Sequence, residues 1–395
     1  MNILSIETSC DETAVSIIRA DGDFPNATYT ILGNALFSQI DIHREYGGVF
    51  PAVAKREHAK TLVPMLARAL QEAKLLEARA TPISQEQTEQ LNEILYREPG
   101  LGELLLTFIS ENTKPQIDLI AVTSGPGLEP ALWVGINFAR ALSYIWNIPV
   151  VPVNHMEGHV LSSIFSINEI PKISFPAIAL LISGGHTELD LMRDWAQYER
   201  IGETRDDAVG EAFDKVARML GLPYPGGPEI GSRARRARAE HLPEFTKLPR
   251  PMLDAQNFDF SFSGLKTAVR YAIEGRTLSE NEIDSVAREF EDAVTEVLLN
   301  KTQRALLQHH AQTVIVGGGV SANSYIRDSF KTFFTKEYPD LTLYFPPQNL
   351  STDNSVMIAL AGHVRASDAL SFEALSDLRA DGNLSLSSNL STCTS

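Results

Sequence analysis

The 395-residue sequence contains very little cysteine and no long apolar run. Cys10 and Cys393 are too few for the disulfide framework of a small secreted domain, which favours a reducing compartment. The first residues show no basic stretch followed by an apolar one, and no segment reaches the about 20 apolar residues that cross a bilayer. We therefore expect a cytoplasmic protein without a membrane partner.

Positive charge is also scarce, because 34 lysines and arginines face 50 aspartates and glutamates and leave a formal net charge of −16. This balance argues against a uniformly basic nucleic-acid-binding protein, but a binding groove needs only a local stripe. The concentrated basic run covers residues 232–238 and continues with Lys247 and Arg250, and a smaller run covers residues 55–60. Either run could contact phosphates, although a solvated helix face is the more common role.

Three familiar motifs are missing: the P-loop, G-x-G-x-x-G between a strand and a helix, and the H-E-x-x-H of zinc peptidases. The sequence does contain His155-Met-Glu-Gly-His159. In a helix, these i and i+4 histidines lie on one face and suit a single metal ion, while Glu157 points elsewhere. A pair of surface or capping histidines explains the spacing alone equally well.

A third metal ligand must come from a distant segment, and Asp353 in Ser351-Thr-Asp-Asn354 is the candidate. An aspartate at the head of an apolar helix is more often an N-cap, so only a link to the histidines would favour the ligand role. Two histidines and one carboxylate, with open positions, suit Fe(II) or Zn(II).

Apolar strands alternate with amphipathic helices, which is typical of an α/β protein with mainly parallel sheets. A strand–polar turn–strand unit occurs at residues 2–19 and again at 176–192. A strand–glycine turn–helix unit occurs at 117–146 and again at 313–330. We interpret this pattern as a duplication, which would place two lobes around a central cleft lined by these turns.

The predicted domain limits follow from this repeat. An N-terminal lobe covers residues 1–154 and carries a polar, helix-prone insertion at about 77–116. A C-terminal lobe covers residues 155–380, with the last helix packing back toward the first lobe. The Ser/Asn-rich residues 381–395 are predicted to be disordered.

Two glycine-rich turns offer backbone N–H groups to a phosphate, although each could be an ordinary turn. Residues 181–185 (Leu-Ile-Ser-Gly-Gly) end a buried strand, and residues 317–319 (Gly-Gly-Gly) lie between a strand and a helix. Asp207, Glu211 and Asp214 share one face of a predicted helix. Their repulsion indicates a bound ligand or cation, unless the first acids only complement the helix dipole.

Together these motifs resemble the TsaD/Kae/Qri family of the tRNA threonylcarbamoyladenosine pathway, in its bacterial or organellar TsaD type. The matching stretches run in family order over nearly the whole chain, and their combination is very specific. They are IETSCDETAVSI (6–17), YGGVFP (46–51), SGPGL (124–128), NHMEGH (154–159), LLISGGHTEL (180–189), DDAVGEAFDKVARMLGLPYPGGP (206–228), FSFSGLKTAV (260–269), GGGVSANSYIR (317–327) and STDNSVMIAL (351–360).

The resemblance implies the duplicated ASKHA fold of actin, sugar kinases and Hsp70. It implies transfer of a threonylcarbamoyl group from threonylcarbamoyl-AMP to N6 of the adenosine 3′ of the anticodon, in tRNAs that read codons beginning with A. One divalent metal is implied, with Fe(II) favoured over Zn(II). The implied partners are tRNA, a TsaB-type paralogue and a TsaE-type ATPase.

By match of motif, His155, His159 and Asp353 are the implied metal ligands. Asp11, in the first polar turn, is similar to an acidic family residue beside the phosphates. The implied substrate-binding residues are Leu181, Ile182, Ser183, Gly184, Gly185, Asp214, Gly227, Gly231 and Asn323.

The sequence departs from the family pattern at three places. The insertion at 77–116 is longer than the usual connection, and Glu129 and Pro130 replace small or apolar residues. Gly231 stands where bacterial relatives often have aspartate, so we expect one ribose contact to be absent there. The competing functions are a small-molecule kinase of the same fold, a metallopeptidase and a non-catalytic scaffold, of which the kinase gives no reason for the two histidines.

Overall fold

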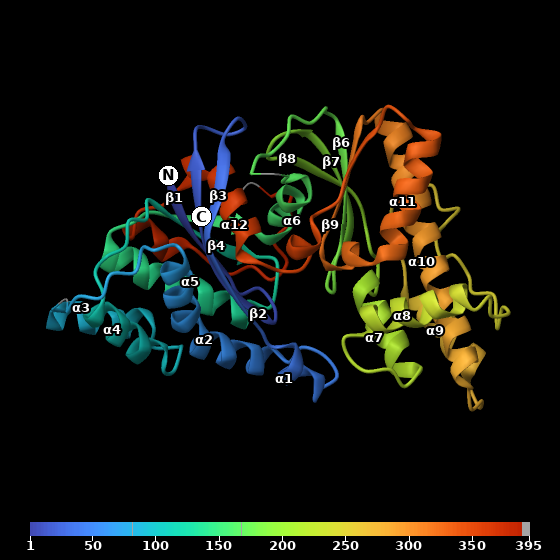
Figure 1. Ribbon diagram of the computed structural model, residues 1–395, viewed down its shortest axis with the longest axis horizontal. Coiled ribbons are helices and arrows are strands. Elements are labelled where there is room, and N and C mark those ends of the chain that lie inside the picture. The colour runs from blue at the N-terminus through green and yellow to red at the C-terminus, as the bar shows by residue number, and fades with distance from the viewer. Residues whose placement is uncertain (81, 167, 389–395) are drawn as a thin grey trace. The chain divides into compact units, whose positions relative to one another are not determined.

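The computed structural model describes residues 1–80, 82–166 and 168–388. The chain forms two compact units. Unit 1 contains residues 1–172 and the segment from Asp353 onward, and unit 2 contains Ile173–Thr352. Each unit is built on one five-stranded sheet (Figure 1).

The sheet of unit 1 has the strand order β3-β2-β1-β4-β5. Its strands are β1 (Asn2–Glu7), β2 (Glu12–Asp21), β3 (Thr28–Ser38), β4 (Leu119–Gly125) and β5 (Val150–Asn154). The first three pair antiparallel, whereas β4 pairs parallel to both β1 and β5. β1 and β4 are buried almost throughout, which explains why both are nearly continuous apolar runs.

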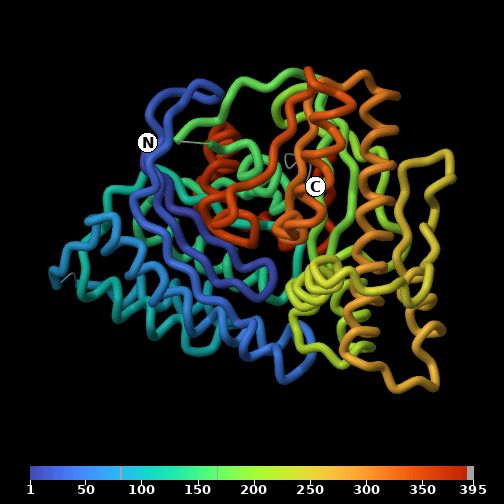
Figure 2. The backbone as a smooth tube through the Cα atoms, turned by 45° about the vertical axis from the view of Figure 1, so that its right-hand side comes forward, coloured from blue at the N-terminus to red at the C-terminus, as the bar shows by residue number. Residues whose placement is uncertain are grey.

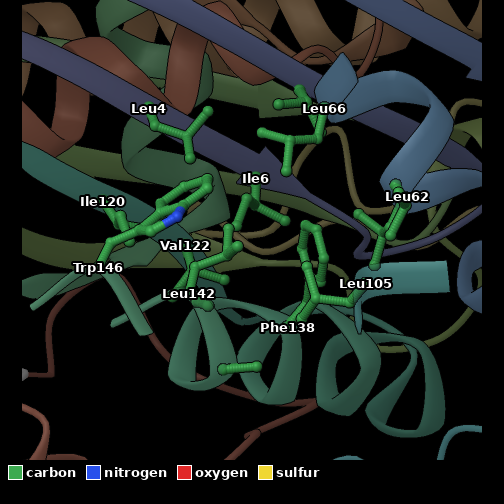
Figure 3. Close-up of a cluster of buried hydrophobic side chains, with 14 of the residues drawn as sticks. Leu4, Ile6, Leu62, Leu66, Leu105, Ile120, Val122, Phe138, Leu142 and Trp146 are labelled. Atoms are coloured by element: carbon green, nitrogen blue, oxygen red, sulfur yellow. The ribbon is translucent and has the colours of Figure 1, made fainter. Parts of the chain in front are cut away.

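Helices cover both faces of this sheet. α2 (Pro51–Glu72) and α5 (Glu129–Trp146) pack on the face that carries Leu4 and Ile6, and Figure 3 shows part of the resulting core. α12 (Ser355–Val364) packs on the opposite face, where Ser5 Oγ donates to the Ser355 carbonyl at 2.7 Å. α6 (His155–Ile164) lies against α12, and the short α1 (Ile40–Arg44) precedes α2. In Figure 2 the red last part of the chain lies beside the blue first strands, as these contacts require.

The insertion forms two helices, α3 (Gln85–Ile94) and α4 (Leu101–Glu111). Its buried side chains join the core of unit 1; they are Leu91, Ile94, Leu95, Leu101, Leu105, Phe108 and Ile109. Between the helices, the buried Glu98 accepts a hydrogen bond from Asn137 Nδ2 at 3.1 Å and pairs with Lys55 Nζ at 3.3 Å. The predicted helical character is confirmed, and the insertion is an integral part of unit 1.

Unit 2 repeats this topology. Its strands are β6 (Ala177–Ile182), β7 (Thr187–Asp194), β8 (Gln197–Glu203), β9 (Thr313–Gly317) and β10 (Thr342–Tyr344). Its α-helices are α7 (Val209–Met219), α8 (Gly226–Ala239), α9 (Ser263–Ile273), α10 (Glu280–His309) and α11 (Ser324–Glu337). The order β8-β7-β6-β9-β10 matches β3-β2-β1-β4-β5 position for position, with the same antiparallel and parallel pairs. The predicted duplication is confirmed, and the cleft between lobes stays a prediction.

The structure divides the chain after Lys172, whereas the sequence placed the boundary at residue 154. The histidine-bearing α6 belongs to unit 1 because it packs against α12, which itself packs on β1 and β2. The predicted disorder of residues 381–395 is wrong for 381–388, where Leu384 and Leu386 are buried and Asp381 N donates to Ser124 O at 2.9 Å. Residues 389–395 lie outside the described residues. Among the described residues, no helix combines the length and apolar character of a membrane span.

Candidate functional site

The two histidines and Asp353 come together in unit 1. α6 begins directly after β5, and Asn154 caps it by accepting a hydrogen bond from Met156 N at 2.8 Å. This cap places His155 and His159 on consecutive turns of a buried helix. Their Nε2 atoms lie 3.5 and 3.2 Å from Asp353 Oδ1, and one ligand atom from each of the three residues lies within 4.8 Å of the others.

Asp353 is not the N-cap that the sequence alone favoured. The N-cap of α12 is Asn354, whose Oδ1 accepts a hydrogen bond from Met357 N at 3.0 Å. The carboxylate of Asp353 is therefore directed to the histidines instead of the helix end. Burial by itself would raise the pKa of Asp353, but His155 and His159 hold it well below its ordinary value.

The two imidazoles differ in their environment. Burial alone would lower the pKa of His155, but the carboxylates of Glu7 and Asp353 raise it well above its ordinary value. Burial lowers the pKa of His159, and Asp353 only partly offsets this effect. Among the described residues, neither ring nitrogen of His159 has a hydrogen-bond partner. A buried imidazole with unused nitrogens beside a carboxylate fits a metal ligand.

Glu7 is a functional-site residue that the sequence analysis missed. It ends β1, is fully buried, and its Oε2 lies 3.1 Å from His155 Nδ1. The same oxygen accepts a hydrogen bond from Thr123 Oγ1 at 2.6 Å, and Oε1 accepts one from Ser9 N at 2.5 Å. A single glutamate before a polar turn usually marks the end of a strand at the surface, so the sequence pattern did not indicate that Glu7 lies beside His155.

The polar turn between β1 and β2 carries the predicted Asp11. Asp11 is nearly buried, and its carbonyl accepts a hydrogen bond from Gln39 N at 2.9 Å. Burial, together with the negative charges of Asp11 and Asp353, raises the pKa of Glu12 well above its ordinary value. The charges of Asp11, Glu12 and Asp353 therefore act on one another within unit 1, an environment that favours a cation.

The glycine-rich turns of unit 2 are built by close backbone packing. Gly318 has φ +87°, and a Cβ there would lie 2.4 Å from the carbonyl oxygen of Ile182. The turn after β9 therefore rests directly on the end of β6, where Leu181 and Ile182 precede the turn at Ser183. By contrast, a Cβ on Gly184 or Gly185 would meet nothing within 4 Å. Both residues are exposed, so this side of their backbone is open to an incoming group, while Gly210 packs against another side of Gly184.

The remaining predicted substrate residues of unit 2 lie on α7, α8 and the start of α11. Asp214 Oδ1 accepts a hydrogen bond from Gly226 N at 2.7 Å, which fixes the start of α8 next to the open backbone of Gly227. Asn323 caps α11 through Ile326 N at 3.0 Å, and its Nδ2 donates to Glu291 Oε1 at 2.7 Å.

Lysines of unit 2 pair with two of the three acids that the sequence placed on one helix face, and the first of these, Asp207, precedes α7. Asp207 pairs with Lys215 at 2.8 Å and with Lys266 at 2.9 Å, and Glu211 pairs with Lys215 at 2.8 Å. These lysines offset the repulsion that the sequence indicated. Asp214 uses its carboxylate on the backbone of α8 instead.

The basic run of residues 232–238 joins α8 to α10 and is not an open phosphate-binding stripe. The ion pairs are Arg233 with Glu280 and Asp284, Arg236 with Asp284, Arg238 with Glu291 and Asp292, and Arg250 with Glu289 and Glu296. In the smaller run, Lys55 pairs with Glu98, Arg56 and Lys60 both pair with Glu57, and His58 is buried. Most of the concentrated positive charge is therefore used inside the fold.

Two mixed five-stranded units of identical topology define a duplicated α/β protein of the ASKHA class. In agreement, the chain is similar in fold to HypF from T. kodakarensis, with a TM-score of 0.55 and 13% identity over 95% of this chain and 49% of that one. The family model "TsaD: tRNA N6-adenosine threonylcarbamoyltransferase" matches residues 30–83 and 106–360, leaving out most of the insertion. The chain belongs to this family.

Curated relatives agree over nearly the full length. The tRNA N6-adenosine threonylcarbamoyltransferase of Persephonella marina is 41% identical over 389 residues, which is 96% of each chain. The proteins of the same name from Nitrosomonas europaea and Bacillus subtilis are 40% and 38% identical, over 92% of this chain and 93% and 90% of theirs.

Proposed function

We propose that this chain transfers a threonylcarbamoyl group from threonylcarbamoyl-AMP to N6 of the adenosine 3′ of the anticodon, in tRNAs that read codons beginning with A. The observation that carries the proposal is the meeting of His155, His159 and Asp353 in a chain whose family match spans nearly its whole length. Cytoplasmic tRNA is the acceptor in this proposal.

His155, His159 and Asp353 would hold one divalent metal, with Fe(II) favoured over Zn(II). Two imidazoles and one carboxylate suit either ion and leave positions open. When bound, the metal supplies a Lewis acid that polarises an oxygen of the threonylcarbamoyl group. Because metal ligands must be deprotonated, His155 has to release the proton that Glu7 and Asp353 favour in the metal-free protein.

The glycine turns of unit 2 would bind the AMP part of the donor. Backbone N–H groups near Gly184 and Gly185 can offset charge that develops on the leaving phosphate. Asn323, Asp214 and Gly227 would contact the nucleoside. The adenine amine is a weak nucleophile, so much of the acceleration should come from positioning. Asp11 remains the candidate acidic residue beside the phosphates.

The chain is also proposed to work with a TsaB-type paralogue and a TsaE-type ATPase. The ion pairs that occupy most of the arginines of α8 support this proposal, because they leave little concentrated positive charge for tRNA. Part of the tRNA contact would then come from a partner.

One observation argues against a peptidase. Glu157 is fully buried and its Oε2 accepts from Arg365 Nε at 3.0 Å, so it is not available as a general base. A catalytically inactive scaffold is disfavoured because all three candidate ligands are in place.

The test is a reconstitution with purified chain, threonylcarbamoyl-AMP and unmodified tRNA, with and without the two partners. Digested nucleosides are analysed by mass spectrometry. Threonylcarbamoyladenosine should form with the wild type and with His310→Asn, an exposed histidine of unit 2, but not with His155→Ala. Product formation by a folded His155→Ala variant would refute the metal assignment.

A further inference from the structure

Behind His155, on the side away from Asp353, lies the buried carboxylate of Glu7. We propose that Glu7 is a positioning residue: it holds the hydrogen of His155 on Nδ1, so that the Nε2 lone pair is directed at the metal. The inference rests on the proposed metal centre, but it concerns a residue that is not one of the three ligands.

Three donors converge on this one carboxylate. Ser9 N donates to Oε1 at 2.5 Å, while Thr123 Oγ1, at 2.6 Å, and His155 Nδ1, at 3.1 Å, share Oε2. The two other donors come from the turn after β1 and from the neighbouring strand β4, so two separate segments hold the carboxylate. With Glu7 fully buried, its position is set by these contacts and not by solvent.

The contacts define the tautomer of His155. An ionised carboxylate only accepts hydrogen bonds, so Nδ1 must carry the hydrogen. Ser9 Oγ, at 3.2 Å from the same nitrogen, can adapt because a hydroxyl rotates. The remaining nitrogen, Nε2, is the one that lies 3.5 Å from Asp353 Oδ1, on the side of the candidate metal.

His159 has no such support. Neither of its nitrogens is hydrogen-bonded within the described part of the chain, although its Nε2 also faces Asp353. The two histidines are therefore unequal: a second carboxylate behind the ring orients His155, whereas His159 has only Asp353 in front of it. A carboxylate behind a metal-bound histidine also raises its basicity, which strengthens the metal bond.

Glu7→Gln creates a conflict that the wild type avoids. If the amide NH₂ takes the place of Oε1, it faces the donor Ser9 N–H. If it takes the place of Oε2, His155 Nδ1 has to become an acceptor, which moves the hydrogen to Nε2 and blocks the metal. The Thr123 hydroxyl can reverse its role by rotating, His155 can do so only by moving its hydrogen to Nε2, and the Ser9 N–H cannot do so at all.

The experiment measures the Zn²⁺ affinity of the purified full chain by competition with a chromogenic chelator, and records the visible spectrum of the Co²⁺-loaded protein. Glu7→Gln should weaken Zn²⁺ binding by about 10–100-fold and change the Co²⁺ bands. The matched control is Glu98→Gln, which neutralises another buried carboxylate of unit 1 and should leave the affinity within about twofold of wild type.

Wild-type Zn²⁺ affinity in a folded Glu7→Gln protein would overturn the inference and leave the metal centre intact. No Zn²⁺ binding by the wild type would instead refute the metal centre itself. If Glu7→Gln does not fold, Thr123→Val decides, since it removes the donor that orients Oε2 but keeps the charge. It should weaken Zn²⁺ binding several-fold, and an unchanged affinity there would count against the inference.

Discussion

The contact between the two turns of unit 2 predicts that alanine lowers the stability of the protein at Gly318 but not at the neighbouring Gly319. Gly318 has φ +87° and ψ 163°, a region of backbone conformation that is essentially restricted to glycine. A Cβ there would also lie 2.4 Å from the carbonyl oxygen of Ile182, at the end of β6. At Gly319, one residue on, a Cβ would meet no heavy atom within 4 Å.

The cost of Gly318→Ala follows from these two features. Backbone strain contributes about 1–3 kcal/mol. Overpacking against a carbonyl that belongs to a fully buried strand contributes a further 1–3 kcal/mol or so. We therefore expect Gly318→Ala to lower the free energy of unfolding by at least about 2 kcal/mol, and Gly319→Ala to change it by less than about 0.5 kcal/mol.

Urea unfolding of both variants, followed by circular dichroism, checks this difference. Calorimetry of AMP binding tests a separate effect on affinity. A methyl group on Gly319 would enter the proposed phosphate site and weaken AMP binding without loss of stability. Equal stability of Gly318→Ala and wild type would refute the packing argument. Equal AMP affinity of Gly319→Ala and wild type would place the phosphate elsewhere.

Three further predictions concern unit 1. Asp353→Ala should abolish metal binding and tRNA modification while the protein stays folded, as measured by metal analysis and circular dichroism; full activity would contradict the site. Deletion of residues 84–105 removes five buried apolar side chains and should lower the melting temperature by more than about 5 °C, while AMP binding by unit 2 persists. Burial lowers the pKa of His58 from 6.5 to about 4, so the unfolded chain binds the proton first. The contribution of His58 to the free energy of unfolding should be fully present above pH 6.5 and should fall by up to about 3 kcal/mol as the pH drops toward 4. Urea unfolding at several pH values should show a weaker pH dependence for His58→Gln than for wild type. The same pH profile in both proteins would contradict the prediction.

The sequence predicted most strands of the fold because their apolar runs are buried. It missed β8, whose residues are mostly half-buried or exposed and lack a core pattern. It also did not define where α8 begins, because the first residues of this helix are two glycines and a proline. In the structure Pro225 is the N-cap, Gly226 and Gly227 begin the helix, and Pro228 lies in its first turn, where its missing N–H has no cost.

In the candidate site, too, the features that are local in the sequence were predicted and those that depend on the tertiary fold were not. The spacing of His155 and His159 is local, so a helix pattern was sufficient to place them on one face. The partnership of Glu7 with His155 joins residues 148 positions apart and depends on β1, β4 and α6 meeting, which no periodicity encodes. The sequence alone favoured Asp353 as a helix cap, and only the fold shows that its neighbour Asn354 takes this role.

Gly231 shows how the fold changes the meaning of a sequence departure. The absence of a carboxylate at this position suggested a missing ribose contact. In the structure, a Cβ at Gly231 would lie 3.4 Å from Glu291 Oε1 and 3.5 Å from Asn323 Nδ2. The space is therefore bordered by a buried carboxylate that already binds Asn323 and Arg238. An aspartate at 231 would place a second negative charge beside Glu291, whose pKa burial already raises, so glycine is the residue that this arrangement accommodates.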